Sequence, residues 1–190
     1  MMMVRLAVAQ PSLPRPRLLL ELAVGAGLTA CFFAVLGREP GIYRGLLAFA
    51  YLALLFLMAV HDIRSLRVPN RIAYPALGFG VAASLTLGWS DTTEALLGGT
   101  AAFLLLLLIA IAGRGAMGFA DVKVGTFCGI VVGLAGVLPM FFIAFASGAL
   151  VSALLLLLRI RKPKDVVAFT PFLVAATAFS ISYFHLYLVS

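Results

Sequence analysis

From Val124 to Leu158 the chain runs for 35 residues without a charged side chain. Coiled as one α-helix, this stretch would be roughly 50 Å long at about 1.5 Å per residue, whereas the hydrocarbon core of a bilayer is about 30 Å thick. It is therefore long enough to cross a membrane and too long to cross it only once. We expect the chain to turn back around Gly133, Gly136 and Pro139.

Apolar residues dominate the rest of the chain as well. Of its 190 residues, 64% are hydrophobic and 11% are charged, which is more apolar surface than a soluble domain of this length can bury. We therefore predict an all-α, polytopic integral membrane protein, a helical bundle of about seven transmembrane helices. The expected spans are 18–36, 45–61, 72–89, 95–112, 122–136, 138–158 and 167–189.

Charge is distributed unequally between the segments that join these spans. With the N-terminus in the cytoplasm, twelve of the 14 Lys and Arg residues lie on the cytoplasmic side, and only Arg38 and Arg44 lie outside. Short cytoplasmic loops of membrane proteins are enriched in such cations. We expect residues 1–17 to form a cytosolic basic tail and residues 18–190 a membrane domain. The net charge of +7 fits contact with the lipid bilayer, and no nucleic acid is expected as a partner.

The two cysteines, Cys31 and Cys128, both lie inside apolar runs, and the sequence contains no CxxC pair. This pattern supports neither a zinc site nor a disulfide framework, and we expect no metal and no cofactor. A second interpretation concerns residues 28–31, because LTAC is similar to a lipoprotein cleavage site. The span 18–36 would then be a cleaved signal peptide, although its apolar run continues beyond the cysteine.

Two of the seven acidic residues stand at the borders of expected spans. Asp62 follows the span 45–61, and Asp121 precedes the span 122–136. A carboxylate at the edge of a hydrocarbon phase is costly, so such a residue is by default a candidate functional group. Two spans separate the aspartates along the chain, which places both on the cytoplasmic side. They could instead cap helices or pair with cations such as Arg64.

Two carboxylates on one face of a membrane can hydrolyse a peptide bond. The ionised one takes a proton from water, while the protonated one donates a hydrogen bond to the carbonyl oxygen. Like charges a few ångströms apart share one proton. Because Asp121 begins a helix and Asp62 ends one, the helix dipoles favour Asp121 as the ionised partner. Lys123, close to Asp121 in sequence, would add to this bias.

The residues that follow the first aspartate resemble a motif of the type IV prepilin peptidases. That family carries an aspartate at the cytoplasmic end of a helix, followed after a few residues by an aliphatic residue, Pro, and Asn or Asp. The sequence HDIRSLRVPN matches this pattern at Asp62, Val68, Pro69 and Asn70.

The second aspartate stands in a similar match. The family's second motif is Gly-Met-Gly-x-Gly-Asp-x-Lys, and AMGFADVK agrees with it at Met117, Gly118, Asp121 and Lys123. A later segment, FTPF at 169–172, is similar to the family's PFGPFL stretch. The two aspartate motifs, in this order and separated by two spans, indicate a resemblance over roughly residues 45–185.

The resemblance implies a multi-pass aspartic endopeptidase of the prokaryotic cytoplasmic (inner) membrane, with its N-terminus in the cytoplasm and its active site facing the cytoplasm. Its substrate would be a prepilin or pseudopilin-like protein with a basic leader, cleaved at the cytoplasmic border of the membrane. Asp62 and Asp121 would be catalytic, and Gly118, Ala120 and Lys123 would support them. The Cys-rich cytosolic segment of longer members is absent from this sequence, so the resemblance gives no basis for predicting N-methylation.

One supporting position departs from the family pattern. Ala120 stands where the family has Gly directly before the second aspartate. If this position requires a positive φ, an alanine there costs on the order of 1 kcal/mol. The departure would then alter the loop geometry.

Further residues are candidates for contact with the substrate or the lipid head groups. Arg64 and Arg67 fit head groups, with an acidic substrate residue as the alternative. Asn70 is a candidate cap for the helix that follows it. Pro171 belongs to the late Pro-Phe segment. The complete set is Arg64, Arg67, Asn70, Gly125, Gly129 and Pro171.

The glycines of this set admit two interpretations. Gly125, Gly129 and Gly133 recur every four residues and would form one small-residue face of a helix. Such a face packs closely against another span of the same protein. Alternatively, it forms a groove for the apolar helix of the substrate.

Three other functions stay open. A presenilin-like intramembrane aspartyl protease cleaves within a span, and its aspartates should lie deep within apolar runs. A proton-coupled carrier needs ionisable groups near the bilayer midplane, and Glu21 in the first expected span is the one candidate. A non-catalytic membrane subunit of a pilus or secretion assembly system is the third alternative, with Ala120 as the mark of lost activity.

Overall fold

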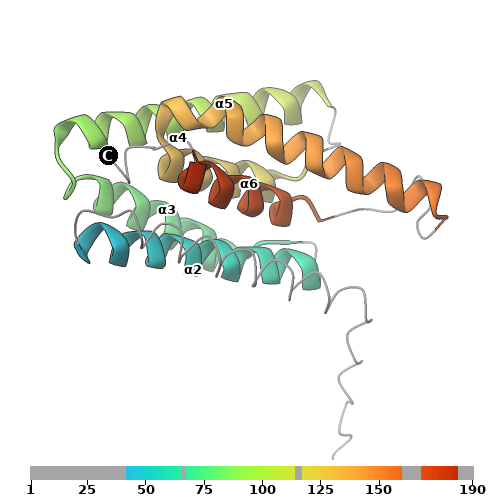
Figure 1. Cartoon of the computed structure of the whole chain (residues 1–190), viewed down its shortest axis with the longest axis horizontal. Coiled ribbons are helices and arrows are strands. Elements are labelled where there is room, and N and C mark those ends of the chain that lie inside the picture. Colours follow the sequence, from blue (N-terminus) through green and yellow to red (C-terminus); the bar gives the residue numbers. More distant parts are fainter. Residues whose placement is uncertain (1–41, 66, 114–116, 160–167, 184–190) are drawn as a thin grey trace, which may run out of the picture.

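The computed structural model describes residues 42–65, 67–113, 117–159 and 168–183 (Figure 1). All regular structure in these ranges is α-helical. The elements are α2 (Ile42–Ser65), α3 (Asn70–Ser84), α4 (Trp89–Ala112), α5 (Phe119–Leu157) and α6 (Thr170–Tyr183). The expected all-α class is confirmed for this part of the chain.

Among the described residues, three helices are long and apolar enough to cross a membrane: Tyr43–Ser65, Trp89–Ala112 and Phe119–Leu157. They cover the spans expected at 45–61, 95–112, 122–136 and 138–158.

The expected number of about seven spans is not confirmed. The span expected at 72–89 is the 15-residue helix α3, which reaches roughly 22 Å and is shorter than a hydrocarbon core. α6 is apolar but also short, and its expected continuation beyond residue 183 lies outside the described residues. The span expected at 18–36 and the basic tail 1–17 lie outside them as well.

α5 changes direction within its length. Gly133 has φ 70° and ψ 175°, a conformation that glycine adopts readily and other residues avoid. The two halves pack side by side, since a Cβ atom on Gly125 would lie 3.6 Å from the Phe141 ring. At the break, the Leu134 N–H donates to a Glu94 carboxylate oxygen at 3.1 Å, which satisfies a backbone group left free where the second half begins. The predicted turn is confirmed, at Gly133.

Small residues allow α4 and α5 to approach closely. A Cβ on Gly98 would collide with the Gly129 carbonyl, and a Cβ on Gly129 would lie 2.5 Å from that of Ala102. Gly125 is covered in the same way by Leu106. Backbone contact of this kind is how helices pack within a membrane. The groove that Gly125 and Gly129 could have offered to a substrate is therefore filled by α4. The close-packing interpretation is confirmed, and the alternative, a contact with substrate, is wrong for these two residues.

An aromatic cluster joins α2, α3 and α5 in the buried core. Tyr51 is fully buried and meets Phe127 and Phe79 edge to face, with 5.8 Å and 5.7 Å between ring centroids. Its hydroxyl donates to the Gly80 carbonyl at 3.4 Å, so the buried oxygen has a partner. Large apolar side chains such as Phe142, which is 76% exposed, cover the outside of the bundle, as expected of a surface that faces lipid.

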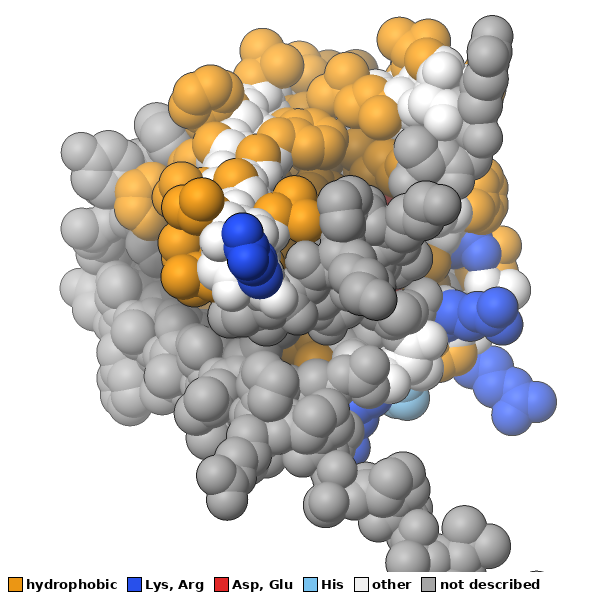
Figure 2. Space-filling model, turned by 90° about the vertical axis from the view of Figure 1, so that its right-hand side faces the viewer, with side chains coloured by type: hydrophobic (Ala, Val, Ile, Leu, Met, Phe, Trp, Pro, Cys, Tyr) orange, Lys and Arg blue, Asp and Glu red, His pale blue; other side chains and the backbone are white. Residues whose placement is uncertain are grey.

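The helix ends gather at two opposite ends of the bundle. At the first end, Arg44 near the start of α2 forms an ion pair with Asp91 of α4 at 3.1 Å, and Tyr43 hydrogen-bonds to Thr86. At the second end, α2 and α4 finish and α3, α5 and α6 begin. Figure 2 looks onto this second end, where Lys and Arg side chains emerge beside apolar surface. The exposed cations here are Arg64, Arg67, Arg71 and Arg159.

Candidate active site

Asp62 lies in the last turn of α2 and is 5% exposed. Its Oδ2 accepts a hydrogen bond from the Thr170 main-chain N–H at 3.2 Å. The helix ends three residues later at Ser65, whose hydroxyl donates to the His61 and Arg67 carbonyls at 2.7 Å and 3.0 Å. The hydroxyl thus satisfies a carbonyl that the helix end leaves without an N–H partner, which holds the turn carrying Asp62 in place.

Asp121 lies in the first turn of α5, three residues after the N-cap Gly118. Its N–H donates to the Gly118 carbonyl at 3.0 Å, which closes this turn. Its half-buried carboxylate accepts a hydrogen bond through Oδ1 from the Thr170 hydroxyl at 3.5 Å. A Cβ on Gly118 would lie 3.4 Å from Asp121 Oδ2, in van der Waals contact with the carboxylate.

One residue therefore joins the two aspartates. Thr170, fully buried at the start of α6, donates its N–H to Asp62 and its hydroxyl to Asp121. The structure brings the two carboxylates together at the same end of the bundle, as the parity of the spans predicted. They come from residues 59 positions apart, and α6 supplies the residue that bridges them.

Both carboxylates line one cavity of about 490 Å³. Its wall is formed by the ends of α2 and α4, the start and the second half of α5, and the start of α6. Phe145 stacks on Phe169 there, with 5.2 Å between ring centroids, and small residues such as Gly148 lie between the aromatic rings. Among the described lining residues, Asp62 and Asp121 are the titratable ones. The cavity thus has mainly apolar walls, with the two carboxylates as its titratable groups.

Ala120 does not occupy a strained position. It lies within α5, and the one non-glycine residue with positive φ among those described is Arg159. The family's glycine is thus not needed here for a left-handed backbone. The expected cost of the alanine does not arise.

Lys123 is directed toward α3. Its ammonium donates to Asn70 Oδ1 at 2.6 Å and lies over the Tyr74 and Phe119 rings, 4.7 Å and 5.1 Å from their centroids. These contacts fasten the start of α3 to the start of α5, beside Asp121. Any electrostatic effect of Lys123 on Asp62 and Asp121 would thus act through space, because its hydrogen bond goes to Asn70.

Asn70 has a different role from the one predicted. The N-cap of α3 is Pro69, and no side chain caps that helix end. Asn70 is the first helical residue, and its side chain accepts the Lys123 hydrogen bond instead. The sequence pattern misplaced the cap by one residue because a Pro-Asn pair fits either boundary.

The other predicted contact residues fall into two groups. Arg64 and Arg67 are exposed at the end of the bundle where the aspartates lie, a position open to head groups or substrate. Pro171 is buried behind Thr170 and is not exposed for contact with substrate. Its missing N–H is tolerated because it lies in the first turn of α6, where N–H groups have no helical acceptor.

The helix positions favour Asp121 as the ionised carboxylate, whereas a hydrogen bond from Thr170 favours Asp62. Asp121 lies at a helix start and Asp62 at a helix end, as expected, and the dipoles favour negative charge on Asp121. However, Thr170 donates to both carboxylates, and its N–H lies closer to Asp62 Oδ2, at 3.2 Å, than its hydroxyl lies to Asp121 Oδ1, at 3.5 Å, so the shorter contact stabilises negative charge on Asp62. The dipole contribution is about 0.3–1 kcal/mol, and a hydrogen bond to a charged group contributes about 1.5–3 kcal/mol. The helix ends alone therefore do not decide which of the two carboxyls would hold a proton.

Sequence reasoning missed Thr170 and the aromatic wall. The segment 169–172 was identified by its resemblance to the family, but its sequence did not predict a hydrogen bond to either aspartate. One signal was present: a threonine directly before a proline at a helix start has an N–H with no acceptor in its own helix. Which acceptor it finds depends on packing.

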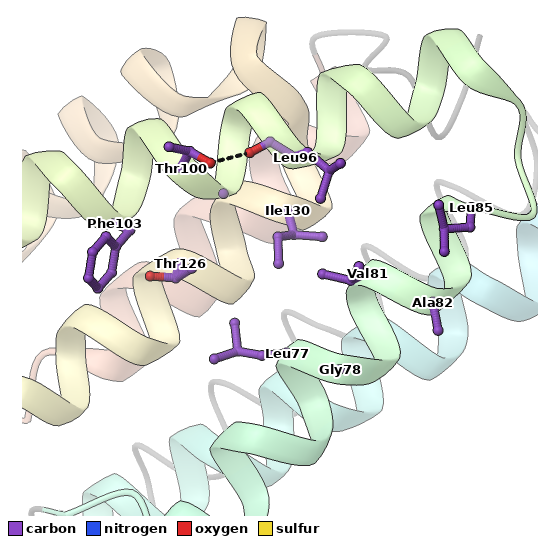
Figure 3. A pocket seen from close by; sticks show the side chains of 11 residues that line it. Leu77, Gly78, Val81, Ala82, Leu85, Leu96, Thr100, Phe103, Thr126 and Ile130 are labelled. Carbon is purple, nitrogen blue, oxygen red and sulfur yellow. Dashed lines mark hydrogen bonds between the residues drawn. The ribbon is translucent and has the colours of Figure 1, made fainter.

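A second cavity, of about 620 Å³, lies between α3, α4 and α5 (Figure 3). Leu77, Val81 and Ile130 point into it, and its lining contains no ionisable residue. The hydroxyls of Thr100 and Thr126 donate to carbonyls of their own helices. This cavity is larger than the first, yet it has no group that could carry out hydrolysis.

Comparison with known proteins agrees with the motifs. Residues 49–153 match the type IV leader peptidase family. A prepilin leader peptidase/N-methyltransferase of Bacillus subtilis (strain 168) is 33% identical over 157 residues, covering 82% of this chain and 63% of that protein. The chain thus spans less than two thirds of the length of this relative. No solved structure matches this chain. The family match includes both Asp62 and Asp121, and the chain belongs to the type IV leader peptidase family.

Proposed function

We propose that this chain is a membrane-embedded aspartic endopeptidase that removes the leader from type IV prepilin-like substrates. One observation carries the proposal: two carboxylates from distant parts of the chain line a single cavity and bind the same threonine. The family supports a leader peptidase, and the geometry supports the aspartic mechanism.

The reaction uses the pair as acid and base in turn. The ionised carboxylate takes a proton from a water molecule, whose oxygen attacks the peptide carbonyl carbon while the protonated carboxyl gives its proton to the carbonyl oxygen. This step forms a tetrahedral gem-diol. When the C–N bond breaks, the amine leaves with the proton taken from water, and a diol hydroxyl returns a proton to the other carboxylate. Asp62 and Asp121 end the cycle as they began it.

The place of cleavage follows from the polarity of the bundle. Exposed Arg64, Arg67 and Arg159 lie at the end that holds the aspartates, whereas Asp91 and Glu94 lie at the opposite end. Cations favour the cytoplasmic side. We place the active site at the cytoplasmic face of the inner membrane, where the basic leader of a prepilin meets its apolar helix.

The proposal is tested by co-expression with a prepilin-like substrate and by following the loss of its leader. Asp62→Asn and Asp121→Asn should each lower processing by at least about 100-fold, because either change removes the acid or the base. Asp91→Asn is the matched control, since it lies at the opposite end and pairs with Arg44. Wild-type processing by either active-site variant would refute the aspartic mechanism.

Two rival functions lose support from the geometry. The non-catalytic subunit rested on strain at Ala120, and this residue lies in a regular helical turn. A presenilin-like protease requires aspartates deep within spans, whereas Asp62 lies in the last turn of α2 and Asp121 in the first turn of α5. Cleavage at the membrane border is the reaction that this placement favours.

A further inference from the structure

The start of α6 presents Thr170 to both aspartates at once. Its N–H is one of the first-turn groups that a helix leaves without an acceptor, and it is directed to Asp62 at 3.2 Å. The next residue is Pro171, which has no N–H, and the helix closes through Phe172 and Leu173 onto the Phe169 carbonyl. The Thr170 N–H therefore has the carboxylate as its partner.

The Thr170 side chain contacts the other carboxylate of the pair. It is fully buried, and a threonine in a helix has two common χ1 rotamers. Its hydroxyl lies 3.5 Å from Asp121 Oδ1, on the opposite carboxylate. Phe169 and Phe172, before and after it in sequence, line the cavity.

We propose that Thr170 is a positioning residue, which sets the separation and orientation of Asp62 and Asp121 by binding one through its N–H and the other through its hydroxyl. This inference rests on the proposed function. It assigns to α6, which lies outside the matched residues 49–153, a direct part in the assembly of the catalytic pair. The N–H contact belongs to the backbone and survives substitution, so the hydroxyl is the part that mutation can remove.

The decisive variant is Thr170→Val, which keeps the shape and the N–H but removes the hydroxyl donor. We expect kcat to fall on the order of 10-fold with KM nearly unchanged, because the carboxylate pair is misplaced while the cavity is intact. The acidic limb of the pH–rate profile should move to higher pH by up to about one unit, since the carboxylate pair loses a donor that stabilises its negative charge. Thr170→Ser keeps a hydroxyl and should restore most of the activity.

Thr177→Val is the matched control on the same helix. Thr177 is also fully buried, and its hydroxyl donates to the Leu173 carbonyl and to Met140 Sδ, away from the aspartates. It should leave the pH profile unchanged. If Thr170→Val matches the wild type, or if both valine variants lower activity and thermal stability equally with no change in profile, Thr170 is only structural and the proposal fails. Should Thr170→Val not fold, Thr170→Ala decides in the same way.

Infrared titration of the carboxyl bands separates this inference from the proposed function. Asp62→Asn and Asp121→Asn identify the bands, and Thr170→Val should shift the Asp121 band relative to the wild type, whether or not a prepilin is cleaved. If the aspartate variants still process substrate but the band shifts, the proposed function fails, and Thr170 orients two carboxylates that are not catalytic. If processing depends on both aspartates but the Thr170 change moves neither band nor profile, the inference alone is wrong.

Discussion

At the scale of single residues, the site depends on small groups beside the carboxylates. Gly118 lies beside Asp121, and a Cβ there would be in van der Waals contact with the carboxylate at 3.4 Å. Ala120, which departs from the family motif, lies in a helical turn and carries no backbone strain. The departure is therefore compatible with an intact site.

The variant Ala120→Gly tests whether Ala120 is free of backbone strain. Restoring the family's glycine should leave processing within about twofold of the wild type, because no positive φ is relieved. Stability should fall slightly, by up to about 1 kcal/mol, because glycine is a poorer helix former. The measurement is prepilin processing together with the melting temperature in detergent. A large gain in activity would show that the alanine does distort the loop.

At the scale of elements, the packing of α4 against α5 holds the site. Asp121 begins the first half of α5, and its position depends on how closely that half lies to α4. Gly98 and Gly129 meet backbone to backbone, and the break at Gly133 returns the second half of α5 toward the cavity, where Gly148 lines the wall. A long apolar stretch thus contributes both sides of the same cavity.

Gly129→Ala should disrupt this contact, since the added methyl would lie 2.5 Å from the Ala102 Cβ. We expect destabilisation of about 1–3 kcal/mol from overpacking, and a lower melting temperature. The matched control is Gly78→Ala in α3, where a Cβ meets nothing within 4 Å and should be neutral or slightly stabilising. Equal melting temperatures for the two variants would contradict the close α4–α5 contact.

At the scale of the whole molecule, the two ends of the bundle carry different groups. One end holds the aspartate pair and exposed arginines, and the other holds the Arg44–Asp91 ion pair and the exposed Trp89. Trp is enriched at membrane–water interfaces, and Arg on the cytoplasmic side. These two preferences together support the proposed orientation.

The proposed orientation predicts the accessibility of introduced cysteines. In a background with Cys31 and Cys128 changed to Ser, Arg67→Cys should react with an impermeant maleimide only after the cells are permeabilised. Ser90→Cys, exposed at the opposite end, should react in intact cells. The reverse pattern would place the aspartates outside and remove the cytoplasmic border as the cleavage site.

Much of the architecture could be read from the chain itself. Apolar length and charge distribution predicted a helical membrane protein, the turn at Gly133 and two aspartates at one end, because burial in lipid constrains each stretch of sequence locally. The motifs around Asp62 and Asp121 also indicated the family from sequence alone, because each motif is a contiguous segment of the chain.

Contacts between distant segments were decided by the tertiary structure. The sequence did not predict that α3 is too short for an ordinary span, that α4 fills the glycine face, that Lys123 binds Asn70, or that Thr170 joins the carboxylates. Each of these depends on which helix faces which, and at what rotation. Helix rotation and pairing follow from side-chain packing over the whole bundle, which no single stretch of sequence contains.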